Sequence, residues 1–275
     1  MKHPIIETSS VTLAWQQWLG SPAGLYLRKW EQTQLDDVVA DLFGYHALQL
    51  GTAELAALRA NRMPHRWLAQ SEEGMPCDFA AHSVALPFQA DSLDLVVLPH
   101  SLELSLDPHA SLREAERVLV PEGHLVITGL NPTSLWGWRY RRAQGYRRLG
   151  AVRMSERLDA PACGDMLGYW RLCDWLRLLG FEVKISRFGC WRPAFQNAQW
   201  LERMAWMDRL GTRFWPILGG AYLIVAVKRV QGGRLMGASW KNKRVAAAAA
   251  MPVARRQNTS PKTGAAQRST DIESR

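Results

Sequence analysis

The segment 86–132 constrains the fold of this 275-residue chain more than any other, because a strand, a helix and a second strand can be recognised in it from independent signals. Residues 94–98 (DLVVL) are mostly apolar, which is typical of a parallel strand covered on both faces. Asp107 and Pro108 predict the start of a helix, since the Asp side chain accepts bonds from free backbone N–H groups and Pro suits the first helical position. A Pro-Glu-Gly turn and the apolar run 124–128 follow. The segment therefore predicts one crossover of an open α/β sheet.

The rest of the chain supplies further elements of the same kind. Apolar periodicity and the positions of Gly and Pro predict helices at 11–19, 30–43, 53–60, 168–179 and near 195–210, and strands at 46–50, 66–70, 77–81, 181–188 and 221–230. With 47% hydrophobic residues, the chain can bury one large core. We therefore expect a single α/β domain followed by a tail.

The net charge of +9 is concentrated in one part of the chain. Residues 231–275 carry nine Lys or Arg against Asp271 and Glu273, so this tail holds +7 and the preceding residues hold +2. The tail lacks the spaced apolar residues that a fold requires, and we expect it to be disordered. Its charge predicts either a solubilising role or a weak, salt-sensitive contact with nucleic acid or an anionic surface.

A second basic cluster lies inside the expected domain. The sequence WGWRYRR at 136–142 is followed by Arg147, Arg148 and Arg153, and no acidic residue occurs from 136 until Glu156. Because ligands of open parallel sheets bind beyond the carboxyl ends of the strands, this segment is expected over the mouth of an active site. It is either a solvated arginine-rich helix or a lid that selects an anion, such as a carboxylate, a phosphate, a thioester-linked carrier or an RNA backbone.

The segment 86–132 also resembles the nucleotide-binding core of class I S-adenosylmethionine (SAM)-dependent methyltransferases, particularly the type 11 branch. The family pattern of L-P-F, S-x-D-L-V, L-E, D-P, L-R-E, R-V-L and P-x-G-x-L recurs at this spacing. It is matched by Leu86, Pro87, Phe88, Ser92, Asp94, His100, Leu102, Glu103, Asp107, Pro108, Leu112, Arg113, Glu114, Arg117, Val118, Leu119, Pro121 and Gly123. The resemblance implies an α/β, Rossmann-like fold with a mostly parallel seven-stranded sheet, an antiparallel last strand and helices on both faces. It also implies an enzyme that transfers a methyl group from SAM.

The resemblance divides the chain into parts with expected roles. Residues 1–45 are expected to form an N-terminal helical segment that covers the cofactor site, and residues 46–230 the methyltransferase domain. Within that domain, residues 131–167 form an Arg- and Trp-rich insertion over the active site. Residues 231–275 are the basic tail.

The first cofactor motif of the family is degenerate in this chain. Where the family has an acidic residue followed by G-x-G-x-G, the sequence LQLGTAE at 48–54 keeps only Gly51 and has Gln49 in the acidic position. Each missing glycine puts a Cβ where the backbone should approach the ligand closely. The resemblance still implies that Gln49, Gly51 and Thr52 contact the methionine end of SAM, with a weaker hold on its ammonium group. Tyr26 is expected to close over that end, and core packing is its alternative role.

The resemblance implies further cofactor contacts after the second, third and fourth strands. Gln70 stands where an acidic residue binds the ribose hydroxyls. His82 stands where a carboxylate accepts from the adenine amine; a neutral imidazole can also accept, but loses this ability on protonation. The backbone N–H of Ser83 can bind an adenine ring nitrogen, and the loop that contains Pro99 and His100 lines the cofactor.

His100 and Asn131 are the candidate catalytic residues, because they follow the fourth and fifth strands. His100 is a candidate general base, and the alternative is that it only packs or hydrogen-bonds in its loop. Asn131, Trp136 and Arg139 are expected to contact the substrate. Glu103 is expected to anchor the loop of His100.

The first functional interpretation is a cytoplasmic methyltransferase for a small-molecule or carrier-linked methyl acceptor. The alternatives are an RNA methyltransferase that uses both arginine segments and a non-catalytic relative. No N/D-P-P-Y/F-type loop follows the fourth strand, which argues against methylation of nucleic-acid amino groups. Cys77, Cys163, Cys173 and Cys190 lack zinc-site spacing, and no apolar run is long enough to span a membrane, so we expect no metal and no membrane span. The accepting atom and the oligomeric state remain open.

Overall fold

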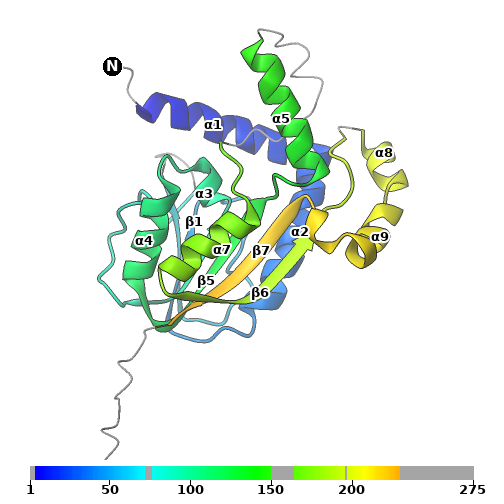
Figure 1. Ribbon diagram of the computed structural model, residues 1–275. Coiled ribbons are helices and arrows are strands. Elements are labelled where there is room, and N and C mark those ends of the chain that lie inside the picture. The colour runs from blue at the N-terminus through cyan, green and yellow to red at the C-terminus, as the bar shows by residue number, and fades with distance from the viewer. Residues whose placement is uncertain (1–3, 72–75, 150–163, 196, 230–275) are drawn as a thin grey trace, which may run out of the picture. The chain divides into compact units, whose positions relative to one another are not determined.

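The computed structural model describes residues 4–71, 76–149, 164–195 and 197–229, which all lie in one compact unit, Met1–Gly232. A seven-stranded sheet with the order β3-β2-β1-β4-β5-β7-β6 runs through this unit (Figure 1). The strands are β1 (His46–Leu50), β2 (His65–Gln70), β3 (Phe79–Ala80), β4 (Leu93–Pro99), β5 (Leu119–Leu130), β6 (Phe181–Gly189) and β7 (Ala221–Lys228). The first five strands in this order, β3, β2, β1, β4 and β5, pair in parallel with their neighbours. Strand β7 pairs antiparallel with both β5 and β6. The expected sheet is confirmed.

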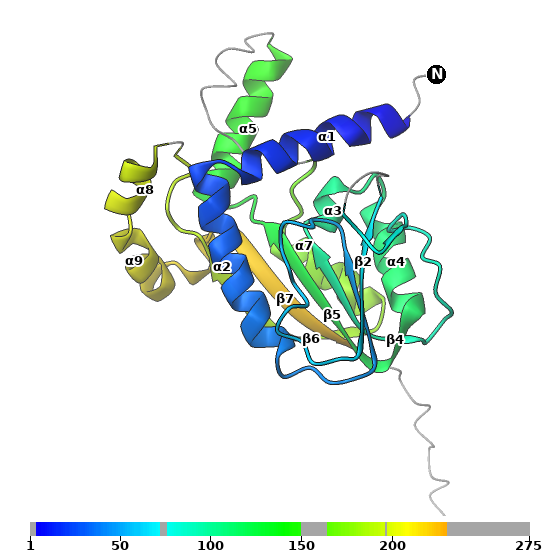
Figure 2. The ribbon, with the colours of Figure 1, turned by 180° about the vertical axis from the view of Figure 1, so that it is seen from behind.

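Helices cover both faces of the sheet, as expected. Helices α4 (Pro108–Val118) and α7 (Tyr169–Leu178) lie on one face, and α2 (Pro22–Val39) lies on the other (Figures 1 and 2). Val126 and Ile127 are adjacent in β5 and contribute to different apolar cores, because successive side chains of a strand point to opposite faces. The core on the α4 side contains Leu112, Leu176 and Ile127, and the core on the α2 side contains Leu35, Val39 and Val126.

The crossover expected between residues 86 and 132 is present. Helix α4 begins after Asp107, whose side chain accepts a 2.9 Å hydrogen bond from the Ala110 N–H. Strand β5 begins earlier than expected, at Leu119, because the Pro-Glu-Gly segment remains within the strand as an irregularity. Its pairing register with β4 shifts there, and Glu122 has a φ of 65°.

The two N-terminal helices begin earlier than expected, and only Gly20 and Ser21 separate α1 (Pro4–Leu19) from α2. Ser21 Oγ accepts a 3.1 Å bond from the Gly24 N–H, and Pro22 occupies the first turn of α2. The Pro-Ala-Gly sequence, which resembles a turn, therefore starts a helix. Helix α1 crosses the edge of the sheet at which the parallel strands end (Figures 1 and 2).

The helix expected at 53–60 is absent, and this prediction was wrong. Successive turns occupy the segment: the Leu55 N–H bonds the Thr52 carbonyl and the Arg59 N–H bonds the Ala56 carbonyl, each three residues back. The side chain of Gln49 takes two of the carbonyl groups in this loop. The Ala57 N–H donates to Gln49 Oε1 at 2.9 Å and is therefore not available for a helical bond to the carbonyl four residues back.

The chain after β6 also differs from expectation. The helix expected near 195–210 is two short helices, α8 (Ala198–Arg203) and α9 (Trp206–Phe214), followed by the 3-10 turn η1 (Pro216–Leu218). Helices α3 (Ser101–Leu104) and α5 (Leu135–Arg148) follow β4 and β5. Cys163 and the basic tail at 231–275 lie outside the described residues.

Candidate functional site

A polar cavity lies at the edge of the sheet where β1, β2 and β4 end. Its volume is about 70 Å³, and its lining comes from the loops after these strands and from α1. Gly51, Thr52, Gln70 and Ser83, four of the residues predicted to bind the cofactor, are among the lining residues. The structure therefore brings together predicted contacts that follow three different strands.

The loop after β1 is tied to the end of β4. Gly51 has a φ of +75°, and a Cβ there would lie 3.1 Å from Ser101 Oγ. Ser101 Oγ donates to the Leu50 carbonyl, and Thr52 Oγ1 donates to the Pro99 carbonyl at 3.0 Å. Glycine is required at position 51 by both the backbone conformation and the close packing of the loop. Pro99 contributes to the site through its carbonyl group.

Gln49 braces the same loop and does not line the cavity. Its side chain is buried; Nε2 donates to the carbonyls of Thr52 at 3.1 Å and Leu55 at 2.6 Å, while Oε1 accepts from the Ala57 N–H at 2.9 Å. Both ends of the amide are used inside the loop. The structure therefore does not support the expected contact between Gln49 and the ammonium group of SAM.

His82 and Ser83, which are adjacent in sequence, lie in different surroundings. The side chain of His82 is exposed and does not line the cavity, while its carbonyl accepts a 3.0 Å bond from the Ala85 N–H. Ser83 lines the cavity, and its Oγ lies 2.8 Å from Ser111 Oγ. The placement supports an adenine contact from Ser83 and does not support one from the imidazole of His82.

His100 is the middle member of a buried triad. Its Nε2 lies 2.7 Å from Glu31 Oε1 on α2, and its Nδ1 lies 2.9 Å from Glu103 Oε2 on α3. All three side chains are buried, and the ring of Trp15 covers the imidazole at a centroid distance of 4.6 Å. Glu103 also accepts a bond from the Leu130 N–H, which matches its expected role as an anchor of this loop.

The charges of the triad argue against a role as general base. Burial disfavours the imidazolium, but the carboxylates of Glu31 and Glu103 outweigh this effect and raise the pKa of His100 to about 10. Burial raises the pKa of Glu103. At neutral pH the ring of His100 is therefore a cation, and an imidazolium has no lone pair with which to take a proton. The alternative expectation, that His100 packs and hydrogen-bonds in its loop, agrees with the structure.

Tyr26 packs in another part of the same edge. Its hydroxyl donates to Asp208 Oδ1, and the guanidinium of Arg192 lies 4.6 Å from its ring centroid and donates from Nε to Asp208 Oδ2 at 2.8 Å. Burial, followed by the neighbouring Cys190 and the hydrogen bond to Asp208, raises the pKa of Tyr26 above its usual value. Tyr26 does not line the polar cavity. Core packing, the alternative role, agrees with this placement.

The three residues predicted to contact the substrate are in contact with other parts of the protein. Asn131 is buried, and its Nδ2 donates to the Ile217 carbonyl at 2.7 Å, which fixes the segment before β7. Trp136 is fully buried, and its indole N–H is bonded to a backbone carbonyl at 2.6 Å. The guanidinium of Arg139 lies 5.5 Å from the ring centroid of Phe195. None of the three lines either cavity at this edge.

The donors and acceptors at the polar cavity fit the chemistry of SAM. The lining residues carry hydroxyl and amide groups and no carboxylate, which suits neutral ribose and adenine. Two buried carboxylate oxygens on neighbouring elements, Glu31 Oε2 and Glu54 Oε2, have no hydrogen-bond partner among the described residues. Unpaired buried acceptors are costly, but neither of these carboxylates lines the polar cavity.

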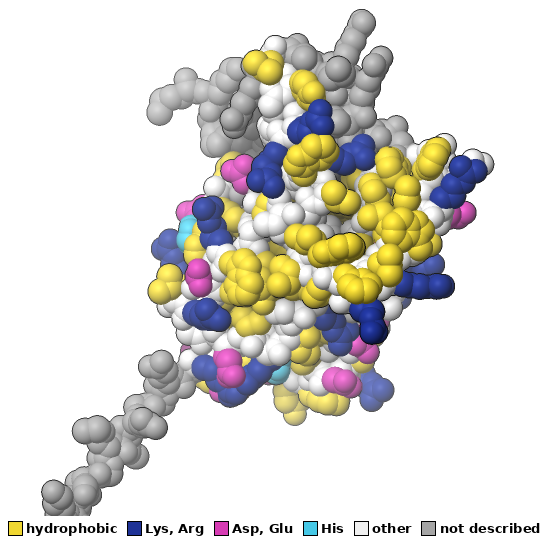
Figure 3. Space-filling model, turned by 45° about the vertical axis from the view of Figure 1, so that its right-hand side comes forward, with side chains coloured by type: hydrophobic (Ala, Val, Ile, Leu, Met, Phe, Trp, Pro, Cys, Tyr) yellow, Lys and Arg dark blue, Asp and Glu magenta, His cyan; other side chains and the backbone are white. Residues whose placement is uncertain are grey.

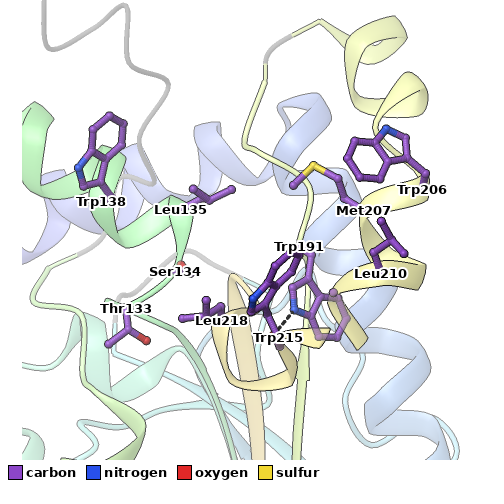
Figure 4. A pocket seen from close by; sticks show the side chains of 11 residues that line it. Thr133, Ser134, Leu135, Trp138, Trp191, Trp206, Met207, Leu210, Trp215 and Leu218 are labelled. Carbon is purple, nitrogen blue, oxygen red and sulfur yellow. Dashed lines mark hydrogen bonds between the residues drawn. The ribbon is translucent and has the colours of Figure 1, made fainter. Parts of the chain in front are cut away.

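A second and larger cavity lies beyond the ends of β5 and β6. Its volume is about 620 Å³, and its walls are almost entirely apolar. Figure 4 shows Leu135 and Trp138 of α5 facing Trp206, Met207 and Leu210 of α9, with Trp191 and Trp215 between them. The indole N–H of Trp191 donates to the Trp215 carbonyl at 3.0 Å and fixes this side of the cavity. The two cavities share no lining residue.

Helix α1 contacts the surroundings of both cavities. Thr12 lines the polar cavity, whereas the ring of Trp18 meets the ring of Trp136 edge-on at 5.8 Å. Trp136 follows directly after Leu135, which lines the apolar cavity. A movement of α1 would therefore change the surroundings of both cavities.

The fold and the cofactor edge define a class I SAM-dependent methyltransferase. A family model described as a methyltransferase domain matches residues 44–127. The chain belongs to this family, in the type 11 branch, and is a SAM-dependent methyltransferase. It is 37% identical over 214 residues to the uncharacterized protein YafS of Escherichia coli strain K12, which covers 77% of this chain and 80% of that protein.

A solved structure agrees in fold. A SAM-dependent methyltransferase from Thermotoga maritima, described as a possible histamine N-methyltransferase, has a TM-score of 0.51 and 16% identity, and the match covers 72% of this chain and 89% of that one. A SAM-dependent methyltransferase from Archaeoglobus fulgidus has a TM-score of 0.49 and 20% identity, with 73% and 94% of the chains covered. At these identities, the likeness concerns the fold alone.

Sequence reasoning missed the two features that distinguish this site. Glu31 gave no signal, because it lies in a helix 69 positions before His100. The tryptophans that line the apolar cavity come from three separate segments. Of these, only the arginine- and tryptophan-rich stretch at 136–142 was predicted to lie near a binding site. In the described residues, no group of His, Cys, Asp and Glu is arranged to hold a metal ion. None of the helices there is long and apolar enough to cross a bilayer.

Proposed function

We propose that this protein methylates a small-molecule or carrier-linked metabolite that has a large apolar part. The observation that carries this proposal is the tryptophan-lined cavity of about 620 Å³ at the edge where the strands end, where open α/β sheets bind their ligands. Its volume is within the range of roughly 300–1,000 Å³ that small-molecule sites have. An apolar acceptor body would bury its surface there.

The polar cavity is the site that we propose for SAM, which supplies a methyl group on an electrophilic sulfonium. Gln70 and Ser83 would hold the ribose and adenine, and the backbone of Gly51 and Thr52 would approach the methionine end.

Helix α1 would have to move outward for SAM to enter. The polar cavity of about 70 Å³ is much smaller than typical sites for such ligands, and Thr12 of α1 forms part of its lining. The site would then close when α1 returns over the ligand. This supports the expected role of residues 1–45 as a cover of the cofactor site.

The apolar cavity offers no general base. The residues that line it are Thr, Ser, Gly, Leu, Met and Trp, and the hydroxyl groups of Thr133 and Ser134 donate to Asn131. Catalysis would therefore rest on alignment of the acceptor with the methyl group. The accepting atom would be one that needs no proton removed by these residues.

Calorimetry and fluorescence test this proposal. We expect SAM to bind and to protect the amides of α1 in hydrogen–deuterium exchange. An apolar fluorescent probe such as anilinonaphthalene sulfonate should quench the fluorescence of the cavity tryptophans without displacing SAM. Failure to bind SAM at millimolar concentration would contradict the cofactor assignment. Mutually exclusive binding, in which saturating SAM removes all of the bound probe, would contradict the assignment of two separate cavities. Contact of the basic tail with nucleic acid stays a prediction.

A further inference from the structure

An apolar patch, which we call the tryptophan face, surrounds the mouth of the apolar cavity. It comprises Trp138, Trp200, Trp206, Phe214, Trp215 and Leu218, all of which are exposed. The side chains of Trp206, Phe214 and Trp215 are 54%, 60% and 58% exposed, which is unusual for residues of this size. Figure 3 shows apolar side chains gathered over this part of the molecule, with Lys and Arg side chains at the margin. Contiguous apolar surfaces of this kind mark interaction sites.

Helix α9 has the pattern of a helix that lies at an interface. Trp206, Leu210 and Phe214 recur every four residues and form one apolar stripe, and the exposed Arg209 and Arg213 flank it, each three positions after a member of the stripe. A helix with an aromatic stripe flanked by arginines is suited to lie in the boundary between water and lipid.

The charge around the tryptophan face is strongly positive. Helix α5 contains no acidic residue, and the segment 197–218 contains only Glu202 and Asp208. Asp208 is already paired with Arg192 at 2.8 Å. On the same face, the guanidinium of Arg142 lies 4.6 Å from the Trp138 ring and that of Arg203 lies 5.2 Å from the Trp200 ring.

We propose that the tryptophan face docks on a lipid bilayer that contains anionic headgroups. Indole rings favour the headgroup region, because one end of the ring is apolar and the other can hydrogen-bond. Arginines at the margin would bind lipid phosphates, and their charge complements an anionic surface. The aliphatic side chains of Leu210 and Leu218 add apolar area that stacking against nucleic-acid bases would not use.

Docking in this orientation would open the apolar cavity toward the bilayer. Trp138, Trp206 and Trp215 line the cavity and also belong to the exposed face. A lipid-soluble molecule would then pass between the bilayer and the cavity without crossing water. The docking proposal does not depend on the proposed methyl transfer, and its test requires no SAM.

Vesicle flotation with the full-length protein tests the proposal. The probes are vesicles of phosphatidylcholine with phosphatidylglycerol, compared with vesicles of phosphatidylcholine alone. We expect the protein to float with the anionic vesicles. The double variant Trp206→Ser, Phe214→Ser should lower the apparent affinity on the order of tenfold or more, since the variant lacks two aromatic side chains that the bilayer would bury. The double variant Arg209→Gln, Arg213→Gln should weaken binding to the anionic vesicles and have less effect as salt rises.

Matched controls replace residues of the same kind elsewhere on the surface. Phe43→Ser with Leu178→Ser removes two apolar side chains that are 72% and 85% exposed, and Arg113→Gln with Arg171→Gln removes two exposed charges. Both control proteins should float like the parent, and circular dichroism should show that all variants are folded. Flotation that is unchanged by Trp206→Ser with Phe214→Ser would overturn the proposal. A second result would also overturn it: the parent protein does not float with anionic vesicles, and Trp206→Ser with Phe214→Ser abolishes its self-association in native mass spectrometry.

Discussion

His100 Nε2 lies 2.7 Å from Glu31 Oε1, and this contact joins the end of β4 to α2 in the interior of the protein. Together with Glu103, this pair holds α2 against the edge of the sheet at which the polar cavity lies. Removal of one member of a buried ion pair leaves its partner uncompensated, which costs more than an exposed contact would.

We expect His100→Gln to lower the free energy of unfolding by about 3–5 kcal/mol at pH 6, because two buried carboxylates lose their cation. The pKa of His100 is raised from an ordinary value of 6.5 to about 10. Its contribution is therefore complete below about pH 6.5 and is lost as the pH rises toward 10. Denaturant unfolding of both proteins across this range measures it. A difference between them that stays constant from pH 6 to pH 10 would show that the ring is not a buried cation.

The change Gln49→Glu restores the acidic residue that the family has at this position, yet we expect it to be harmful. A carboxylate there would face the carbonyls of Thr52 and Leu55 and would lose both donated bonds. The expected loss of stability is about 3 kcal/mol, since buried groups would be left unsatisfied. Gln70→Glu is the matched control, because Gln70 lines the polar cavity and its amide makes one long contact with the described residues, 3.5 Å to the Pro76 carbonyl. Melting temperature and SAM calorimetry compare the two variants; tighter SAM binding by Gln49→Glu would contradict the role of Gln49 as a brace.

Replacement of His82 should leave SAM affinity nearly unchanged, because its side chain is exposed and outside the lining of the polar cavity. Ser83→Leu should weaken SAM binding at least about tenfold, since the added bulk enters a tightly packed cavity. Titration calorimetry of both variants between acid and neutral pH is the measurement. A pH-dependent affinity that disappears in His82→Ala would instead show that the imidazole binds adenine.

The change Leu210→Trp should fill part of the apolar cavity. We expect weaker binding of an apolar fluorescent probe, by on the order of tenfold, with SAM affinity unchanged, because the two cavities have no lining residue in common. Leu178→Trp on α7 provides a control with the same substitution on an exposed site. Equal probe binding by both variants would show that the probe binds elsewhere.

The elements of the crossover could be predicted because their signals are local. The apolar run of β4, the cap at Asp107 and the apolar residues of β5 each act within a few residues, so the crossover was recognisable. The segment at 53–60 was misread because the Ala57 N–H there bonds the side chain of Gln49 and not the carbonyl four residues back. Apolar periodicity contains no information about such a side-chain contact.

The site was predictable in outline and not in the roles of its residues. The resemblance to the family predicted Gly51, Thr52, Gln70 and Ser83 at the site, and they meet there because residues after parallel strands lie at one edge. The roles of His100 and Asn131 depend on partners that are distant in sequence, namely Glu31 on α2 and the Ile217 carbonyl before β7. Only the folded structure brings those partners together.

The contacts of α1 with both cavities imply that the two ligands would be thermodynamically coupled. Thr12 lies at one cavity and Trp18 touches the support of the other, so a ligand that shifts the position of this helix changes the work required to bind the second ligand. Such coupling is reciprocal: the factor by which the acceptor alters the affinity for SAM must equal the factor by which SAM alters the affinity for the acceptor. The N-terminal helix would thus link the affinities of an otherwise separated pair of ligands.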